Sequence, residues 1–431
     1  MTATLNNTPL KNQLLELLRR SAPITFERYM ELCLYHPEHG YYMQGRERTG
    51  IQGDYFTSPD LHPIFARLVA RQAAEMWEAL GRPSPFTWVE MGPGRGWFAR
   101  DFLAWVKCHQ PDLFSALDYV AVEIGAPQRH RLRERFAEDK IEQEVRIAES
   151  LERVEQIVGC FFSNELVDAF PVAVVTRTGG RLKEIYVTAD GDQLAEKTGP
   201  LSSTALAAAV ARYAHGLEEG HRVEMNLRAM DWIRAVAAKL ARGFVITVDY
   251  GDMAKRLYTP DRPRGTAMAY RGHTVTEDFY GAPGECDLTA HVNFSALIDA
   301  GRDAGLETIG FTTQERFLLA LGEGNQFSDL YESGQSETEQ LQARLKLKRL
   351  INPEGMGNIF KVLIQQRGVP PVDLTGMKYR RNLEVTSGEQ EKRIQETGVR
   401  SQNREFPNAF DEQDILRVSR ARVQNDAEFL F

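Results

Sequence analysis

Short apolar runs alternate with amphipathic stretches through the middle of the chain. A run of consecutive apolar residues indicates a strand buried on both faces, whereas Trp97 to about Lys107 repeats its apolar residues at helical spacing. Buried strands that alternate with helices are typical of a doubly wound, parallel sheet. The pattern therefore predicts an α/β fold, with strands near 86–91, 118–124, 144–148, 160–164 and 243–249.

Helical spacing also marks the chain before the first strand. Leu10 to Arg19 and Pro63 to Leu80 repeat apolar residues every three or four positions, and another helix is expected after Thr25, a typical N-cap residue. We expect residues 1–84 to form a helical N-terminal lid over a ligand pocket.

A long segment separates the fourth and fifth predicted strands. Val172–Thr176 and Leu182–Thr188 are strand-like and are joined at Gly179-Gly180, which is typical of β-hairpins. We predict a β-rich insertion at 171–229 that carries substrate contacts. An extension of the sheet that binds no ligand is the alternative.

The core is predicted to occupy 85–170 and 230–366. Helices are expected at 294–304 and 338–350, and further strands at 306–313 and 360–365. Beyond these the composition becomes polar and mixed in charge, so 367–431 is predicted to be a C-terminal extension with a docked helix from Ile415 to Phe429.

The first strand runs into a glycine-rich turn. Gly92, Gly94 and Gly96 stand at alternate positions between the strand and the helix that begins near Trp97. Glycines let a backbone approach a ligand closely, and the unpaired N–H groups at a helix start attract it. A strand–turn–helix corner without a ligand is the simpler alternative, because one glycine loop is weak evidence.

The spacing of the glycines narrows the choice of nucleotide. The turn lacks the Gly-Lys-Ser/Thr of a Walker A loop and differs from the Gly-x-Gly-x-x-Gly dinucleotide fingerprint. The second strand ends in Glu123, whose carboxylate is suited to the two hydroxyls of a ribose. A Gly-x-Gly-x-Gly turn with a strand-ending acid is the usual arrangement of class I methyltransferases that bind S-adenosylmethionine.

Composition and charge restrict the setting. The chain has 431 residues and a formal net charge of −8, which argues against general nucleic-acid binding. Its four cysteines form no C-x-x-C pair, so we expect a reducing compartment and no disulfide framework. With no long apolar run and no signal-peptide pattern, a cytoplasmic protein without a membrane segment is expected. His36 and His39 have a metal-like spacing but no third ligand nearby, so no metal is expected.

Seven short motifs follow one another along the chain, at Tyr35–Tyr42, 53–59, Glu90–Gly96, Asn164–Val172, 270–273, Asp287–Val292 and Met356–Val362. Through these motifs and their order, the chain resembles the MidA family of class I S-adenosylmethionine-dependent methyltransferases, which includes a mitochondrial arginine methyltransferase that acts in complex I assembly. Trp97, Asp60 and Asn293 depart from the residues usual in that family.

The cofactor residues follow from the strand ends and from the resemblance. The three glycines are expected to cradle the methionine part of S-adenosylmethionine, and Glu90 and Glu123 to fix its amine or ribose. Glu149 and Ser150, after the third strand, are expected at the adenine, with a helix N-terminal acid as the alternative for Glu149. Asp54, in the lid, is a candidate for the amino group, and an Asp turn is its alternative.

The acceptor residues are expected where the fourth strand ends. Asn164 is a candidate for orienting a nitrogen lone pair, and Glu165 and Asp168 for binding a cationic guanidinium through charge-assisted hydrogen bonds. A turn shaped by Asp168 is the alternative. His291 and His273 are candidate general bases, although a histidine that only packs in a loop is more common.

The resemblance implies methylation of a protein side chain, with an arginine nitrogen favoured. Two other functions stay open at this point: an assembly chaperone that keeps the fold without turnover, and an NAD-binding enzyme. A protein substrate is expected and a homodimer is compatible with the sequence, but nucleic-acid and membrane partners are not expected.

Overall fold

The structure of the protein is a computed structural model that describes residues 8–46, 54, 57–272 and 274–380. Parts of two motifs (Gly53, Tyr55, Phe56 and His273) and the helix predicted at 415–429 lie outside the described residues. Within that part of the chain, no helix is long and apolar enough to cross a membrane.

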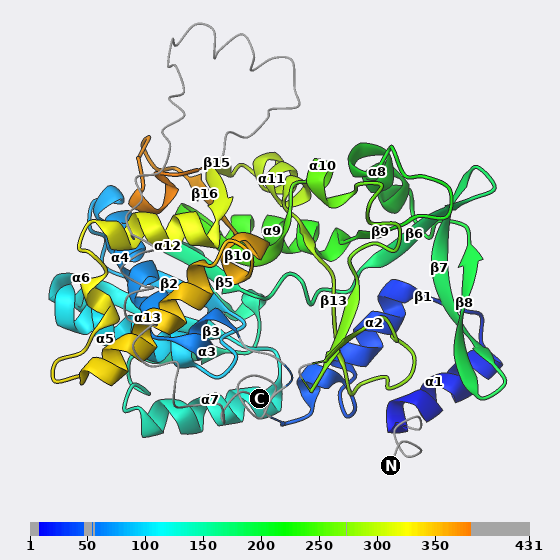
Figure 1. Ribbon diagram of the computed structural model, residues 1–431, viewed down its shortest axis with the longest axis horizontal. Helices are drawn as coiled ribbons and strands as arrows, with labels where there is room; N and C mark the ends of the chain where they lie inside the picture. Colours follow the sequence, from blue (N-terminus) through cyan, green and yellow to red (C-terminus); the bar gives the residue numbers. More distant parts are fainter. Residues whose placement is uncertain (1–7, 47–53, 55–56, 273, 381–431) are drawn as a thin grey trace, which may run out of the picture. The chain divides into compact units, whose positions relative to one another are not determined.

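A mixed sheet forms the centre of the described fold (Figure 1). Its strand order is β15-β16-β10-β5-β2-β3-β4, and the short β14 (Val292–Asn293) pairs with the end of β10. The parallel strands are β2 (Phe86–Met91), β3 (Leu117–Val122), β4 (Val145–Ala148), β5 (Ile157–Asn164) and β10 (Leu240–Asp252).

The parallel sheet predicted from the apolar runs is correct for these five strands but incomplete. β16 (Phe360–Arg367) is antiparallel to β10, and β15 (Glu307–Thr313) is antiparallel to β16. An apolar run that is buried on both faces has the same pattern in either direction, so periodicity alone does not reveal this reversal.

A helical layer buries one face of the sheet. Phe65 on α4 and Phe98 on α5 share a core with Trp88 and Phe162 of neighbouring strands, and the rings of Phe98 and Phe162 lie 4.3 Å apart. Burying such large aromatic side chains supplies much of the free energy that holds strand and helix together. The helices are α1 (Pro9–Arg20), α2 (Phe26–Tyr35), α3 (Ser58–Leu61), α4 (Ile64–Ala79), α5 (Trp97–His109), α6 (Pro111–Ala116), α7 (Ala126–Glu138), α8 (Thr204–Tyr213), α9 (Leu227–Lys239), α10 (Ala254–Leu257), α11 (Phe294–Asp303), α12 (Gln314–Glu323), α13 (Glu337–Ile351) and α14 (Met356–Ile359).

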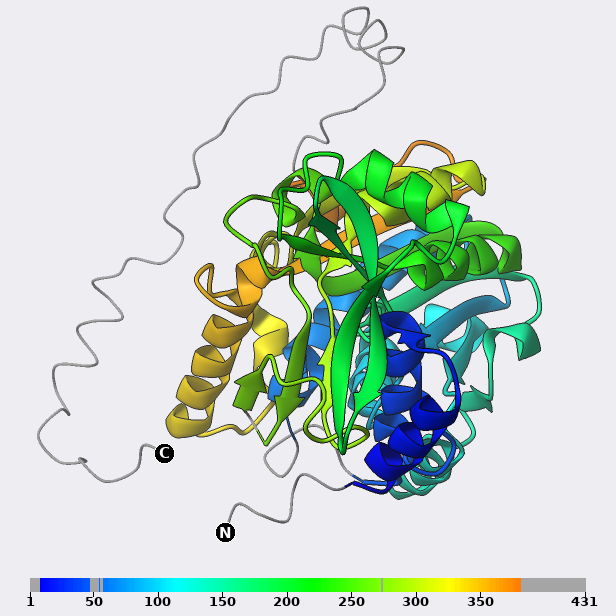
Figure 2. The ribbon, with the colours of Figure 1, turned by 90° about the vertical axis from the view of Figure 1, so that its right-hand side faces the viewer.

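The insertion is β-rich, as its hairpin pattern predicts. Its strands β6 to β9 form an antiparallel sheet in the order β1-β7-β6-β9, with β8 on the other side of β7 and with β1 supplied by the N-terminal segment (Figure 2). A second, three-stranded sheet, β12-β11-β13, lies outside the insertion. These strands are β1 (Ile24–Thr25), β6 (Ala173–Thr178), β7 (Arg181–Asp190), β8 (Gln193–Gly199), β9 (Arg222–Met225), β11 (Met268–Arg271), β12 (Thr274–Thr276) and β13 (Asp287–Thr289).

The N-terminal helices take part in two different cores. α1 and α2 bury Leu14 and Tyr29 against Val174 and Ile185 of the antiparallel sheet, to which β1 also contributes. α4 instead belongs to the core of the central sheet. The segment 1–84 therefore divides between two packing units, a contact pattern that its helical spacing does not show; the four-part domain division stays a prediction.

Candidate active site

The turn after β2 has the open backbone expected of a ligand loop. Gly94 has a φ of +52°, and no atom lies within 4 Å of the position where its Cβ would stand. Gly96, with a φ of +79°, caps the start of α5 and leaves no room for a Cβ, which would lie 2.7 Å from the ring of Phe136 on α7. Phe136 on α7 therefore packs against the turn at Gly96, whereas the space beside Gly94 is open.

Gly92 joins this turn to the end of β5. A Cβ at Gly92 would lie 3.0 Å from the side chain of Leu166. β2 and β5 are parallel neighbours, so their carboxyl ends meet at one edge of the sheet, where ligands bind in open α/β folds. The predicted cofactor loop and the predicted acceptor turn are therefore in contact.

The two strand-ending acids lie at the same edge. Glu90 is buried, and its Oε2 accepts a hydrogen bond of 2.7 Å from the hydroxyl of Tyr119. Burial raises the pKa of Glu90 to about 7, despite that bond. Glu123 follows β3, and its Oε1 accepts the N–H of Gly125 at 2.7 Å. Burial also raises the pKa of Glu123.

Glu149 and Ser150 follow β4, next in the strand order. Ser150 caps the short helical turn that begins at Leu151. The side chain of Glu149 is half exposed and accepts a hydrogen bond of 2.9 Å from Arg153. Both residues are at the expected edge of the sheet, but the carboxylate of Glu149 forms an ion pair with Arg153.

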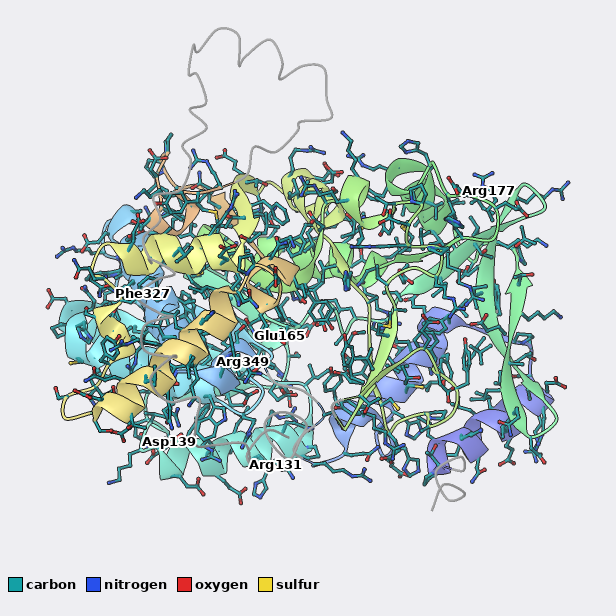
Figure 3. The ribbon with its side chains drawn as sticks, in the orientation of Figure 1. Arg131, Asp139, Glu165, Arg177, Phe327 and Arg349 are labelled. Carbon is teal, nitrogen blue, oxygen red and sulfur yellow. The ribbon has the colours of Figure 1, made fainter. Side chains whose placement is uncertain are left out.

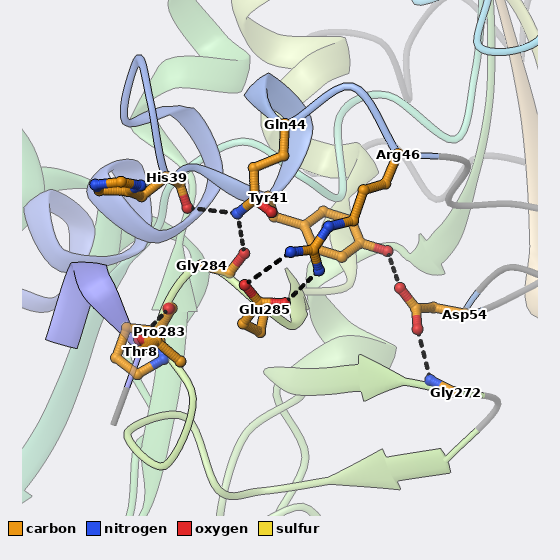
Figure 4. A network of polar contacts seen from close by, with 10 residues as sticks. All are labelled: Thr8, His39, Tyr41, Gln44, Arg46, Asp54, Gly272, Pro283, Gly284 and Glu285. Carbon is orange, nitrogen blue, oxygen red and sulfur yellow. Dashed lines mark hydrogen bonds and ion pairs between the residues drawn. The ribbon is translucent and has the colours of Figure 1, made fainter. Parts of the chain in front are cut away.

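Asp54 is bound on both sides (Figure 4). Its Oδ2 accepts the hydroxyl of Tyr41 at 2.7 Å, and its Oδ1 accepts the N–H of Gly272 at 2.6 Å. Nearby, Arg46 forms an ion pair of 2.6 Å with Glu285. These bonds tie Asp54 to the turn between β11 and β12, and Arg46 to the loop before β13. A cofactor role for Asp54 stays a prediction.

The bulky Trp97 lies among guanidinium groups. Its ring centre is 4.2 Å from Arg100 on α5 and 4.3 Å from Arg135 on α7, with Arg95 at 5.3 Å. Cations stack favourably on an indole face. The indole therefore joins α5 to α7.

A strained turn carries the acceptor candidates after β5. Glu165 has a φ of +53°, an uncommon value for a residue with a side chain, and its N–H donates to the carbonyl of Val248 on β10 at 2.9 Å. Its Oε1 accepts hydrogen bonds from the N–H of Ser58 at 3.2 Å and from the Asn164 side chain at 2.9 Å. Burial of the carboxyl and the charge of Asp168 raise the pKa of Glu165 to about 8. Figure 3 labels this side chain between the central sheet and the β-rich part.

Two acids and a tyrosine stand behind that turn. Asp168 is buried and accepts a short hydrogen bond from the hydroxyl of Tyr250. Asp249, the last buried residue of the central run of β10, is fully enclosed, and its Oδ2 accepts the N–H groups of residues 166–168 at 3.2, 2.9 and 3.3 Å. Burial raises the pKa of both Asp168 and Asp249, and the neighbouring carboxyls raise that of Asp249 further.

The turn collects acceptors without a basic partner. Within the described part of the chain, no Lys or Arg forms an ion pair with Glu165, Asp168 or Asp249. Two buried oxygens here, Oδ1 of Asn164 and Oδ1 of Asp168, lack a hydrogen-bond donor. Buried acceptors are normally satisfied, so the arrangement favours a ligand that brings several donors and a positive charge. No group of three or more His, Cys, Asp or Glu side chains among the described residues is arranged to hold a metal ion.

His291 lies beside this group. Its ring packs edge-on against Tyr250, with centres 5.4 Å apart, and the main-chain N–H of His291 donates to the hydroxyl of Thr266. Burial lowers the pKa of His291 to about 4, which makes it a weak base at neutral pH. The geometry suits a wall of the site better than a general base, and the predicted role is untested.

Sequence reasoning missed Asp249 and Tyr250 as site residues. Asp249 ends the fifth apolar run as Glu90 and Glu123 end theirs, so a strand-ending acid was the available signal. The motif residues Tyr42 and Asp287 were also given no role, although they meet here through a hydrogen bond of 2.7 Å. That bond joins residues far apart in the sequence, which no local pattern reveals.

Comparison with known proteins identifies the family of the chain. Residues 68–312 match the family described as "Putative S-adenosyl-L-methionine-dependent methyltransferase". The human protein arginine methyltransferase NDUFAF7, mitochondrial, is 27% identical over 402 residues, which cover 87% of this chain and 86% of that protein. Its Drosophila melanogaster homolog is 27% identical over 383 residues, 84% of this chain and 85% of the homolog.

A solved structure also matches. A crystal structure of a Burkholderia thailandensis protein bound to S-adenosyl-homocysteine has a TM-score of 0.79 and 31% sequence identity, and covers 86% of this chain and 95% of that one. The native crystal structure of a Burkholderia thailandensis protein matches with a TM-score of 0.76, also at 31% identity.

Proposed function

We propose that this chain, which belongs to the family of S-adenosylmethionine-dependent methyltransferases that includes MidA and NDUFAF7, methylates a guanidinium nitrogen of arginine in a protein. The observation that carries the arginine assignment is the acceptor turn, where buried carboxyls and an amide oxygen gather without a basic partner in the described structure. The names of the curated relatives point to the same substrate.

The residues of the glycine turn fit the cofactor of the family. The open space at Gly94 allows a ligand to lie against the backbone, and Glu123, which follows β3, is our candidate for binding the ribose hydroxyls. When bound, S-adenosylmethionine supplies a methyl group on a positively charged sulfur. The contact between Gly92 and Leu166 brings the glycine turn next to the acceptor turn.

The acceptor turn has the chemistry to hold a guanidinium. This group is planar, has five N–H donors and stays charged, so it pairs with carboxylates through two parallel hydrogen bonds. Glu165 and Asp168 offer the carboxylates, and Oδ1 of Asn164 offers a further acceptor. Held in this way, one nitrogen is oriented for attack, and the proton that it loses on methylation passes to a carboxylate of the turn.

A lysine ammonium is a weaker candidate for this site. Its three donors point in tetrahedral directions from one atom, whereas the acceptors without a donor belong to two different side chains, Asn164 and Asp168, which suits the wider, planar fork of a guanidinium better. The NAD alternative is not supported, because the family is defined by S-adenosylmethionine and a relative binds S-adenosyl-homocysteine. The methyl-transfer experiment described next distinguishes an active enzyme from a chaperone without turnover.

The test is methyl transfer followed by identification of the product. Protein from a lysate of cells that lack this chain is incubated with the purified protein and tritiated methyl donor, and labelled protein is hydrolysed to amino acids. We expect the label in methylarginine. Label only in methyllysine would overturn the arginine assignment, and no label above that of a heat-inactivated control would favour the chaperone.

A further inference from the structure

We infer that Asp249 is the positioning residue of the acceptor turn: its carboxylate gathers the N–H groups of residues 166–168 and so fixes where Glu165 and Asp168 point. The inference rests on the proposed function, because it assigns Asp249 a part in the same reaction. Asp249 acts through the turn, because both of its oxygens are bound by main-chain N–H groups.

The carboxylate of Asp249 binds the main-chain N–H groups of the acceptor turn. Its Oδ2 accepts three successive N–H groups, of which that of Val167 is the shortest at 2.9 Å, and its Oδ1 accepts the N–H of Tyr250 at 2.9 Å. The carbonyl of the preceding Val248 accepts the N–H of Glu165. Two consecutive residues of β10 therefore bind four consecutive N–H groups after β5.

The turn needs such a clamp because its first residue is strained. A left-handed backbone is unfavourable for a residue with a side chain and persists only where its surroundings enforce it. Glu165, at a φ of +53°, is the residue whose carboxyl also lies in the acceptor group. Without the clamp, a relaxed turn would move that carboxyl away from Ser58 and Asn164.

A carboxylate fits this position better than an amide. Both oxygens of Asp249 accept main-chain N–H groups. An asparagine would direct its NH₂ group at one of these donors, which costs a hydrogen bond and places two donors against each other. The shape of the side chain is nearly unchanged, so Asp249→Asn tests the acceptor function rather than packing.

The experiment measures cofactor binding and turnover separately. S-adenosyl-homocysteine affinity and stoichiometry are measured by calorimetry for wild type and Asp249→Asn. Initial rates at increasing concentrations of the lysate protein fraction then give KM and kcat. The kcat is calculated per cofactor-binding site, with the number of sites taken from calorimetry. We expect an affinity within threefold of wild type and a fall in kcat/KM on the order of 100-fold, the scale expected when a reacting group is misplaced by about 1 Å.

Asp329→Asn is the matched control, with the same chemical change. Asp329 is a buried carboxylate that accepts hydrogen bonds from the side chains of Arg71 and, at 3.1 Å, Asn325. It lies in the short helical turn 328–330, to which no substrate or cofactor contact is assigned. Its kcat/KM per binding site should stay within twofold of wild type. If Asp249→Asn does not fold, Asp249→Ser, which is smaller and retains an acceptor, replaces it with the same expected result.

Three outcomes would overturn the positioning role. They are unchanged kcat/KM in Asp249→Asn, a loss of turnover that is fully explained by fewer cofactor-binding sites, and failure of both variants to bind S-adenosyl-homocysteine. The last two outcomes would mean that Asp249 stabilises the sheet and does not position the acceptor turn for the reaction. Absence of methyl transfer by wild type would instead refute the proposed function, so the two failures are distinguishable.

Discussion

Two features of Glu165 lower the stability of the folded protein, and a residue selected only for stability would avoid both. Its backbone is left-handed, and its carboxyl lies near Asp168 with no basic partner among the described residues. Strain and unpaired buried acids of this kind cluster at functional sites. The same features make Glu165 the most informative single residue for mutation.

Replacing Glu165 by Gln should separate binding from turnover. The amide keeps the size of the side chain but removes the charge that pairs with a guanidinium. We expect methyl transfer to fall by about 100-fold or more, with S-adenosyl-homocysteine affinity within about threefold of wild type. Methylation at the wild-type rate would remove Glu165 from the mechanism.

Gly94 tests the cofactor loop at the same scale. Gly94→Val adds a branched side chain at a φ of +52° and fills the open space above the turn. We expect calorimetry to show at least a 100-fold loss of S-adenosyl-homocysteine affinity.

Gly191→Val is the control for backbone strain. Gly191 has a φ of +59° and open space around it, but lies in the turn between β7 and β8. It should lose a similar amount of stability and keep its affinity for S-adenosyl-homocysteine. Equal affinities in the two variants would contradict the placement of the cofactor at Gly94.

At the scale of elements, the junction of α5 and α7 supports the glycine turn. Phe136 of α7 lies under Gly96, and Trp97 of α5 stacks with Arg135 of α7. The indole, which departs from the family pattern, thus strengthens the contact between two helices. It need not have a direct part in cofactor binding.

Trp97→Ala is expected to affect stability more than binding. The loss of the stacked ring should lower the free energy of unfolding by about 1–3 kcal/mol, because area and cation–π contacts are both removed. Denaturant unfolding measures this loss, and calorimetry should show an S-adenosyl-homocysteine affinity within about fivefold of wild type. A large gain in affinity would mean that the indole obstructs the pocket.

At the scale of the whole molecule, buried titratable groups make stability depend on pH. Burial raises the pKa of Glu90 to about 7 and of Glu165 to about 8, so the folded state holds protons that the unfolded state releases near pH 4.5. Burial lowers the pKa of His62 and of His291 to about 4, which acts in the opposite direction. The histidine contribution declines above pH 6.5, as the unfolded state also loses its ring protons.

The ligand-free protein should therefore lose stability between pH 6.5 and 8.5. In this window the folded state binds more protons than the unfolded state, so the free energy of unfolding falls with pH, by about 1–3 kcal/mol. Chemical denaturation at the two pH values measures the change. Glu165→Gln should remove most of it, and an equal decline in that variant would show that other groups are responsible.

The sequence by itself determined the local parts of this protein. Strand and helix periods predicted the elements of the central sheet, the hairpin turns predicted the antiparallel insertion, and motifs in order identified the family, which the comparisons confirm. These features succeed because each depends on residues that are neighbours along the chain. The candidate roles of the site residues stay predictions.

Only the tertiary structure decided how distant segments meet. It reversed β16 relative to the parallel strands and placed β15 beyond it, divided the N-terminal helices between two cores, and bound both oxygens of Asp54 within the protein. It also placed Asp249 behind the turn that carries Glu165. Each of these depends on hydrogen bonds or packing between residues far apart in sequence, whose partners the periodicity of a single segment does not specify.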